Sequence, residues 1–316
     1  MISYSTMEFV EEIVSLKDQL SFQGNIDVPD GIDKIVIAGM GGSGIAGKIF
    51  QDLYTVKPVT LVNSYEIPKF VDSNTLFVAV SYSGNTEETL HAVKRAKEKG
   101  AVIRGITSGG QLAEVLNSTV IVPKGYQPRS AVGYLTIPLL RAFDLFDDSE
   151  VDVAKEHLAK IDKNLGTWQK FADEIFSSNK IPVIFGTPKL EGVSYRWKTQ
   201  FNENAKVLAY SASFPELNHN DTMALENTYR KEEFYFFVLT HKQLEREIAD
   251  RIRITSKLCK IKMANVEGDG NTIFSNIFTL IHKGDYISYF LAKKRDVDPR
   301  NVSIIEDLKR GLKEES

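Results

Sequence analysis

The sequence predicts an α/β fold made of two doubly wound domains, each with a parallel sheet flanked by helices. Apolar, β-branched runs alternate with stretches of helical pattern, and this alternation starts again after residue 150. The length of 316 residues also exceeds what one hydrophobic core usually serves. We therefore expect a first domain over residues 1–150 and a second domain over residues 151–316.

The chain begins with an amphipathic pattern that predicts a helix from about Thr6 to Leu20. Acidic residues interrupt its apolar face, which a signal peptide would not tolerate. No apolar run approaches the roughly 18 residues needed to span a bilayer. We expect a cytoplasmic protein without a membrane partner.

Five buried strands are expected in the first domain, in the runs KIVIAG, VTLVN, TLFVAVS, AVIRGIT and STVIVP. The helical pattern ETLHAVKRAKEKG connects two of them and ends on Gly100, as helices often do. Short strand–helix–strand connections predict a parallel sheet covered on both faces. The second domain repeats the pattern with IPVIFGTP, AKVLAYSA, FYFFVLTH and IKMANVEG. No long Gly/Ser-rich linker separates the halves, so we expect the domains to pack firmly together.

Composition excludes several classes of protein. A net charge of −3 argues against nucleic acid as a partner, because proteins that bind it usually carry a basic excess. Cys259 is the only cysteine, which excludes an internal disulfide and a multi-cysteine metal site. Its apolar neighbours indicate a small buried side chain rather than a nucleophile.

The run IVIAGMGGSGIAG contains the spacing Gly39-x-Gly41-x-x-Gly44, which is that of a dinucleotide-binding loop. Such a site needs an acidic residue at the end of the second strand to hold the ribose. Here that strand ends in Asn63 and Ser64. The sequence therefore disfavours a nicotinamide-dependent oxidoreductase, and we expect no cofactor.

A second polar loop follows the strand TLFVAVS and immediately precedes a helix. Helix N-termini offer free N–H groups and a positive dipole end to anions. Hydroxyls clustered there predict a phosphate site, although one or two of them could simply cap helices. The expected ligands come from both loops: Gly41, Gly42, Ser43, Ser81, Ser83 and Thr86.

The motifs GMGGSGIAG, SYSGNTEET, PRSAVGY, NENAK and ELNHND occur in that order along the chain. Together they resemble the bifunctional phosphoglucose/phosphomannose isomerase family, whose subunits pair two flavodoxin-like SIS domains. The resemblance implies interconversion of glucose 6-phosphate, and of mannose 6-phosphate, with fructose 6-phosphate by metal-free proton transfer. The segment Asn301-Val302-Ser303 departs from the family pattern for accepting both epimers, which leaves the mannose 6-phosphate activity open.

The resemblance also implies roles for four residues. Glu203 in NENAK is the catalytic base, and Arg129 in PRSAVGY stabilises the enediolate without taking its proton. His219 in ELNHND assists ring opening and reaches the site of a neighbouring subunit, which implies a homodimer. Lys309, or its neighbour Lys313, assists ring opening from a C-terminal helix. The apolar stripe of that helix is expected to be buried: Ile304, Ile305, Leu308 and Leu312.

A sugar-phosphate-binding regulator without catalysis remains the alternative. It would share both phosphate loops, because binding needs neither Glu203 nor His219. Such regulators usually carry a helix-turn-helix segment, which the short acidic N-terminal pattern does not provide.

Overall fold

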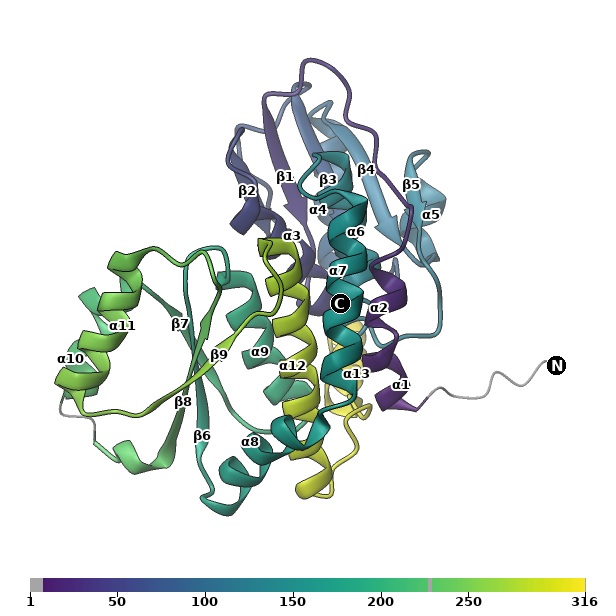
Figure 1. Ribbon diagram of the computed structural model, residues 1–316. Helices are drawn as coiled ribbons and strands as arrows, with labels where there is room; N and C mark the ends of the chain where they lie inside the picture. The colour runs from purple at the N-terminus through teal and green to yellow at the C-terminus, as the bar shows by residue number, and fades with distance from the viewer. Residues whose placement is uncertain (1–7, 227–228, 316) are drawn as a thin grey trace.

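The computed structural model describes residues 8–226 and 229–315, with only the backbone given for Lys313 and Glu315. It confirms the predicted α/β fold of two parallel sheets flanked by helices (Figure 1). Within these ranges no helix combines the length and apolar character needed to cross a membrane.

The first sheet contains all five predicted strands in the order β2-β1-β3-β4-β5, and every neighbouring pair is parallel. Their bounds are β1 Lys34–Ala38, β2 Val59–Val62, β3 Thr75–Val80, β4 Val102–Thr107 and β5 Thr119–Ile121. The strand order reverses between β1 and β3. Parallel doubly wound sheets bind their ligands outside the carboxyl ends of the strands at such a point.

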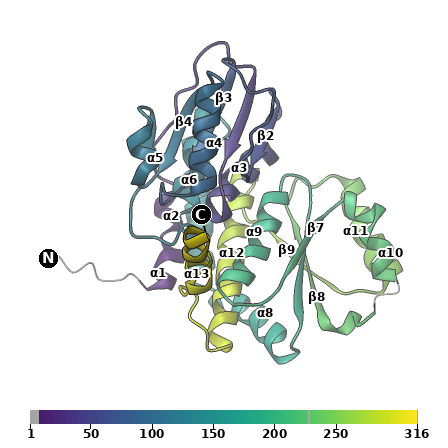
Figure 2. The same ribbon diagram turned by 180° about the vertical axis from the view of Figure 1, so that it is seen from behind.

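Helices cover both faces of this sheet. One face packs against α4 and α5, as Figure 2 shows for α4, and the other packs against α3 and α6. The helices are α3 Gly41–Leu53, α4 Glu87–Glu98, α5 Gly110–Val115 and α6 Val132–Ala142. This double cover explains why β3 is buried along its whole length.

The second sheet has the order β7-β6-β8-β9 and is also entirely parallel. Its strands are β6 Ile181–Gly186, β7 Tyr210–Ser213, β8 Phe234–Thr240 and β9 Met263–Glu267. The strand expected from Ala205 begins later, at Tyr210, because Lys206 adopts a left-handed conformation with φ of 54° that breaks the extended backbone. The other eight predicted strands are confirmed.

The outer face of the second sheet is covered by two α-helices and a 3-10 turn. These are η1 Glu216–His219, α10 Asp221–Glu226 and α11 Arg246–Cys259, and the short turn η2 Lys231–Glu233 precedes β8. Cys259 is buried in this layer, as predicted.

One continuous apolar core joins the inner faces of the two sheets. It is formed around α12 Ile273–Lys294, together with α7 Asp148–Asp162, α8 Leu165–Ser177 and α9 Glu191–Glu203. In Figure 1 α12 and α7 stand between the two lobes. The expectation of firm packing is confirmed. The boundary at residue 150 stays a prediction. Helix α7 starts just before it and packs on both α12 and the N-terminal helix α2 Leu16–Gln19.

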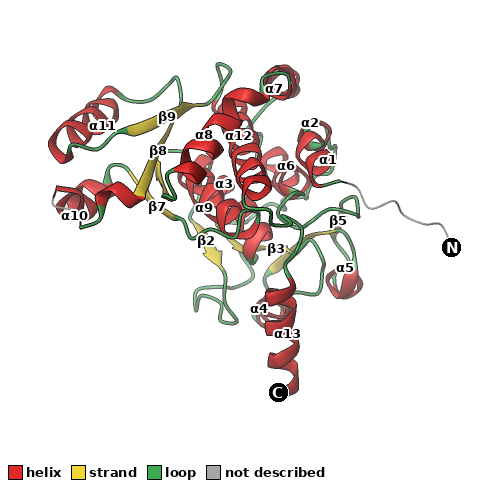
Figure 3. Ribbon diagram, turned by 90° about the horizontal axis from the view of Figure 1, so that it is seen from below, coloured by secondary structure: helices red, strands yellow, loops and turns green. Residues whose placement is uncertain are grey.

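The two ends of the chain differ from expectation. In place of one N-terminal helix there are two short ones, α1 Phe9–Val14 and α2 Leu16–Gln19, while Thr6 lies outside the described residues. The predicted burial of the C-terminal helix is wrong for the single chain. On α13 Ser303–Glu315 the stripe is exposed: Ile304 is 77%, Ile305 39%, Leu308 63% and Leu312 53% exposed. The reason is that α13 projects from the rest of the chain (Figure 3).

Candidate active site at the junction of the two lobes

The glycine-rich loop lies between β1 and α3, against the segment that carries Arg129. A Cβ atom on Gly42 would stand 2.6 Å from Cα of Arg129 and 2.7 Å from its backbone nitrogen. Only glycine allows this approach, because real side chains do not tolerate such distances. Gly42 therefore brings the first turn of α3, with Gly41 and Ser43, next to Arg129.

The second polar loop joins the first through a hydrogen bond. The backbone N–H of Tyr82 donates to Oγ of the buried Ser43 over 3.1 Å. Ser81 Oγ and Thr86 Oγ1 are hydrogen-bonded at 3.0 Å, whereas Ser83 is exposed and accepts from the Asn85 N–H. The four hydroxyl residues therefore gather at the carboxyl ends of β1 and β3, as the sequence suggested.

Helix capping does not account for these hydroxyls. Thr86 occupies the N-cap position of α4, but its side chain makes no capping hydrogen bond and pairs with Ser81 instead. The N-cap of α3 is Met40, which has no hydroxyl. Two helix N-termini and a hydroxyl cluster at one sheet edge form an arrangement suited to a phosphate group.

Arg129 is 3% exposed, and both lobes bind its guanidinium. Nε donates to Asn204 Oδ1 over 2.8 Å, and Nη2 donates to the carbonyl of Pro299 over 2.6 Å. Nη1 faces Gln127 Oε1 at 3.3 Å and Glu203 Oε2 at 3.4 Å. Burial lowers the pKa of Arg129, and the nearby carboxylate of Glu203 opposes this shift. The cation is therefore fixed in orientation rather than solvated.

Glu203 is the last residue of α9, and its side chain is 26% exposed. Its carboxylate therefore reaches solvent while staying beside the buried guanidinium. Lys206, which follows in the same motif, donates to the backbone carbonyl of Glu203. Burial lowers the pKa of Lys206, and the charge of Arg129 lowers it further. The carboxylate of Glu203 thus lies close to two cationic side chains, those of the buried Arg129 and of Lys206.

His219 does not join this group within one chain. Since α9 crosses back over a parallel sheet, Glu203 lies at the edge where the strands begin. β7 then runs to the opposite edge, where η1 ends with the exposed His219. The following helix, α10, lies at the far side of the second lobe in Figures 1 and 2.

Among the described residues, Lys309 forms no hydrogen bond or ion pair with Glu203 or Arg129. It is exposed on the projecting helix α13, about 9 Å along the axis from Ser303 at a rise of 1.5 Å per residue. The side chain of Lys313 lies outside the described residues. The helix is nevertheless connected to the site at its start, because Pro299 lies four residues before Ser303 and accepts from Arg129.

Several residues at the site were not singled out from the sequence. Asn204 and Lys206 belong to the NENAK motif, so their place in this motif beside Glu203 could have identified them as site residues. Lys124 was missed because it lies beyond both polar loops in the chain. Its Nζ is 3.3 Å from where a Cβ of Gly109 would stand, and the Gly109 carbonyl lies against Gly84 of the second loop. Lys124 therefore brings a positive charge to the loop.

In the part of the chain that the structure describes, no group of three or more His, Cys, Asp or Glu side chains is arranged to hold a metal ion. Independence from metal remains a prediction that chelation tests.

The fold and this site define a double-SIS-domain protein. Residues 31–125 match the family model for the SIS domain, and residues 168–312 match that for the bacterial phospho-glucose isomerase C-terminal SIS domain. A solved structure of the C-terminal domain of glucosamine-fructose-6-phosphate aminotransferase from Francisella tularensis has the same fold. Its TM-score is 0.77 at 15% identity, over 93% of this chain and 98% of that one.

Curated relatives define the family more narrowly. A bifunctional phosphoglucose/phosphomannose isomerase from Thermoplasma acidophilum is 50% identical over 99% of this chain and all of its own length. A D-glucosamine-6-phosphate 4-epimerase from Sulfolobus acidocaldarius is 34% identical over 70% of this chain and 72% of its own. The chain belongs to the bifunctional phosphoglucose/phosphomannose isomerase family.

Proposed function

We propose that this protein interconverts glucose 6-phosphate and mannose 6-phosphate with fructose 6-phosphate through an enediolate intermediate. The observation that carries the proposal is the Glu203 carboxylate beside the fixed Arg129 guanidinium, at an edge of the first sheet that is suited to phosphate. The family and the 50% identical relative support the same activity. A regulator without catalysis would need no such pair.

The geometry suits transfer of a proton between C1 and C2 of the open-chain sugar. Glu203 takes the proton from C1 of fructose 6-phosphate, the electron pair forms the C1=C2 bond, and negative charge moves to O2. Arg129 stabilises that charge and cannot act as the base, because its guanidinium keeps its protons. A proton then passes from O1 to O2, and Glu203 returns its proton to C2.

The C2 epimers arise from one intermediate. Protonation on one face of the enediolate gives glucose 6-phosphate, and protonation on the other gives mannose 6-phosphate. Anchoring of the phosphate by Ser81, Ser83 and Thr86 would hold the reacting carbons near Glu203 in both cases. No cofactor takes part in this scheme.

A homodimer would complete the site. His219 lies at the edge of the second sheet opposite Glu203, so a His219 from a second copy is the simplest source of an imidazole for ring opening. Exposed apolar side chains support association: Met223 beside η1 is 72% exposed, and Leu308 on α13 is 63% exposed. Lys309 would assist ring opening once α13 packs against the site or the second copy.

The test is turnover of fructose 6-phosphate by the purified protein in the presence of EDTA, with glucose 6-phosphate and mannose 6-phosphate measured separately. We expect both products from the wild type and none from Glu203→Gln. Glu191→Gln, at the other end of the same helix, is the matched control and should retain activity. Binding of fructose 6-phosphate without turnover would instead support the regulator, and loss of activity in EDTA would refute the metal-free scheme.

A further inference from the structure

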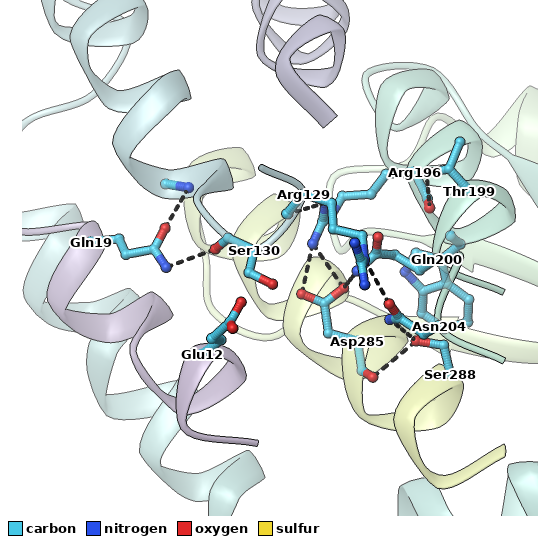
Figure 4. Close-up of polar contacts among 12 residues, drawn as sticks. Glu12, Gln19, Arg129, Ser130, Arg196, Thr199, Gln200, Asn204, Asp285 and Ser288 are labelled. Atoms are coloured by element: carbon cyan, nitrogen blue, oxygen red, sulfur yellow. Dashed lines mark hydrogen bonds and ion pairs between the residues drawn. The ribbon is translucent and has the colours of Figure 1, made fainter. Parts of the chain in front are cut away.

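A chain of three hydrogen bonds runs from the buried helix α12 to Arg129 (Figure 4). Oγ of Ser288 donates to the backbone carbonyl of Asp285 over 3.0 Å. Nδ2 of Asn204 donates to that same Oγ over 2.9 Å, and Nε of Arg129 donates to Oδ1 of Asn204 over 2.8 Å. Asn204 and Ser288 are completely buried, so water does not compete for these groups.

The direction of this chain is fixed by the chemistry of its members. The hydroxyl of Ser288 has one proton, which it gives to a carbonyl that can only accept. Its oxygen must therefore accept from Asn204, and this turns the amide N–H₂ toward Ser288. The amide oxygen then points at Arg129, whose Nε–H can only donate. Without Ser288 the Nδ2 group of Asn204 would lose this acceptor, and only the N–H of Arg129 would favour the observed orientation of the amide.

The backbone of Arg129 is held by the same helix. Arg196 donates to the carbonyl of Arg129 over 2.8 Å, and its Nη2 contacts both carboxylate oxygens of Asp285 at 2.9 and 2.8 Å. Gln200 donates to that carboxylate as well. Helix α12 thus fixes the backbone of Arg129 through Arg196, and the Nε of its guanidinium through Asn204.

We propose that Asn204, with its amide oriented by Ser288, is a positioning residue for Arg129. A guanidinium is planar, so a hydrogen bond at Nε determines where both terminal nitrogens point. With Nε held by Asn204, Nη2 faces the Pro299 carbonyl and Nη1 faces Glu203. This role rests on the proposed isomerase activity, in which Arg129 must lie over the developing charge in one orientation.

The experiment compares Asn204→Ala and Ser288→Ala with Asn202→Ala in fructose 6-phosphate turnover. Asn202 lies on the other side of Glu203 in the motif and donates to the Val207 carbonyl instead of contacting Arg129. We expect kcat to fall about 10- to 100-fold for Asn204→Ala and at least about fivefold for Ser288→Ala, with KM within about threefold. Asn202→Ala should stay within about threefold of the wild type. Thermal unfolding confirms that each variant is folded. If Asn204→Ala does not fold, the kcat of Ser288→Ala tests the proposal instead.

A second arm separates positioning from general loss of structure. In an Arg129→Lys background there is no Nε–H for Asn204 to hold, so adding Asn204→Ala should change kcat less than about twofold. An equal loss in both backgrounds, or wild-type kcat in Asn204→Ala and Ser288→Ala, would overturn the proposal. An inactive wild type would instead refute the isomerase activity, which distinguishes the two failures.

Discussion

Nη1 of Arg129 lies 3.4 Å from Oε2 of Glu203, while the other two nitrogens of the same guanidinium form bonds of 2.8 and 2.6 Å to Asn204 and Pro299. Charge-assisted hydrogen bonds are normally shorter than 3 Å, so the carboxylate is the loosest partner of the cation. Glu203 can therefore accept a proton without Arg129 losing its position.

Replacement of Arg129 by lysine should remove this arrangement although the positive charge is kept. An ammonium cannot match the three directions in which Asn204, Gln127 and Pro299 are contacted. We expect kcat for fructose 6-phosphate to fall about 10²- to 10³-fold in steady-state kinetics. Arg104→Lys, at an ion pair with Asp27 in the same lobe, is the control. Comparable kcat for Arg129→Lys and the wild type would show that charge alone suffices.

A mixture of two inactive variants should regain activity if His219 acts across a dimer. His219→Asn and Glu203→Gln each disable both sites of their own homodimer. A mixed dimer retains one site with both residues intact, so unfolding and refolding the two proteins together should restore about a quarter of wild-type turnover. Activity no higher than that of the separate variants would place His219 outside the partner's site.

The hydroxyl of Thr86 should matter for binding of the phosphate group more than for chemistry. Thr86→Val keeps the shape of the side chain but removes the oxygen paired with Ser81. We expect KM for fructose 6-phosphate to rise about tenfold with a smaller change in kcat, since the interaction acts far from C1 and C2. Thr89→Val, one turn further along α4, is the control because its buried hydroxyl has no hydrogen-bond partner among the residues that the structure describes. Equal KM values for the two variants would contradict a phosphate site at this loop.

Stability should depend on pH through Asp52, which lies near the end of α3 and accepts a hydrogen bond from the start of α9. Burial raises the pKa of Asp52 to about 7, against the opposing effect of the hydrogen bond from the Gly192 N–H. Between about pH 4 and pH 7 the folded protein therefore holds a proton that the unfolded chain has lost, and the free energy of unfolding falls as pH rises.

Asp52→Asn keeps an acceptor for Gly192 but removes this titration. The variant should be more stable than the wild type by about 4 kcal/mol at pH 8 relative to their difference at pH 4. Chemical unfolding at several pH values measures this. A constant difference between the two proteins from pH 4 to pH 8 would contradict the raised pKa.

Local pattern was enough to predict most of the fold. Buried runs such as TLFVAVS have the composition of strands covered on both faces, and eight of the nine strands were predicted close to their observed positions. The late start of β7 depends on the positive φ of Lys206, which no apolar pattern encodes. The amphipathic pattern of α13 indicated an apolar face but not what would cover it, so the predicted burial of Leu308 was wrong.

The site could be predicted only in part for a similar reason. Ser81 and Thr86 stand close together in the chain, and the strand–loop–helix pattern places them at one sheet edge. The contacts of Arg129 with Asn204 and Pro299, and of Asn204 with Ser288, join segments far apart in the sequence, so they depend on how α9 and α12 pack. The close approach of Gly42 to Arg129 also becomes evident only when the first domain is folded, because the two residues are far apart in the sequence.

Isomerisation of fructose 6-phosphate in D₂O, followed by NMR, tests most directly whether Glu203 transfers a proton through an enediolate. We predict that the wild type introduces solvent deuterium at C2 of both glucose 6-phosphate and mannose 6-phosphate. Glu203→Gln should abolish both exchange and turnover, whereas Glu191→Gln should leave them unchanged. Products that form over many turnovers without deuterium at C2 would indicate a hydride shift and contradict proton transfer by Glu203.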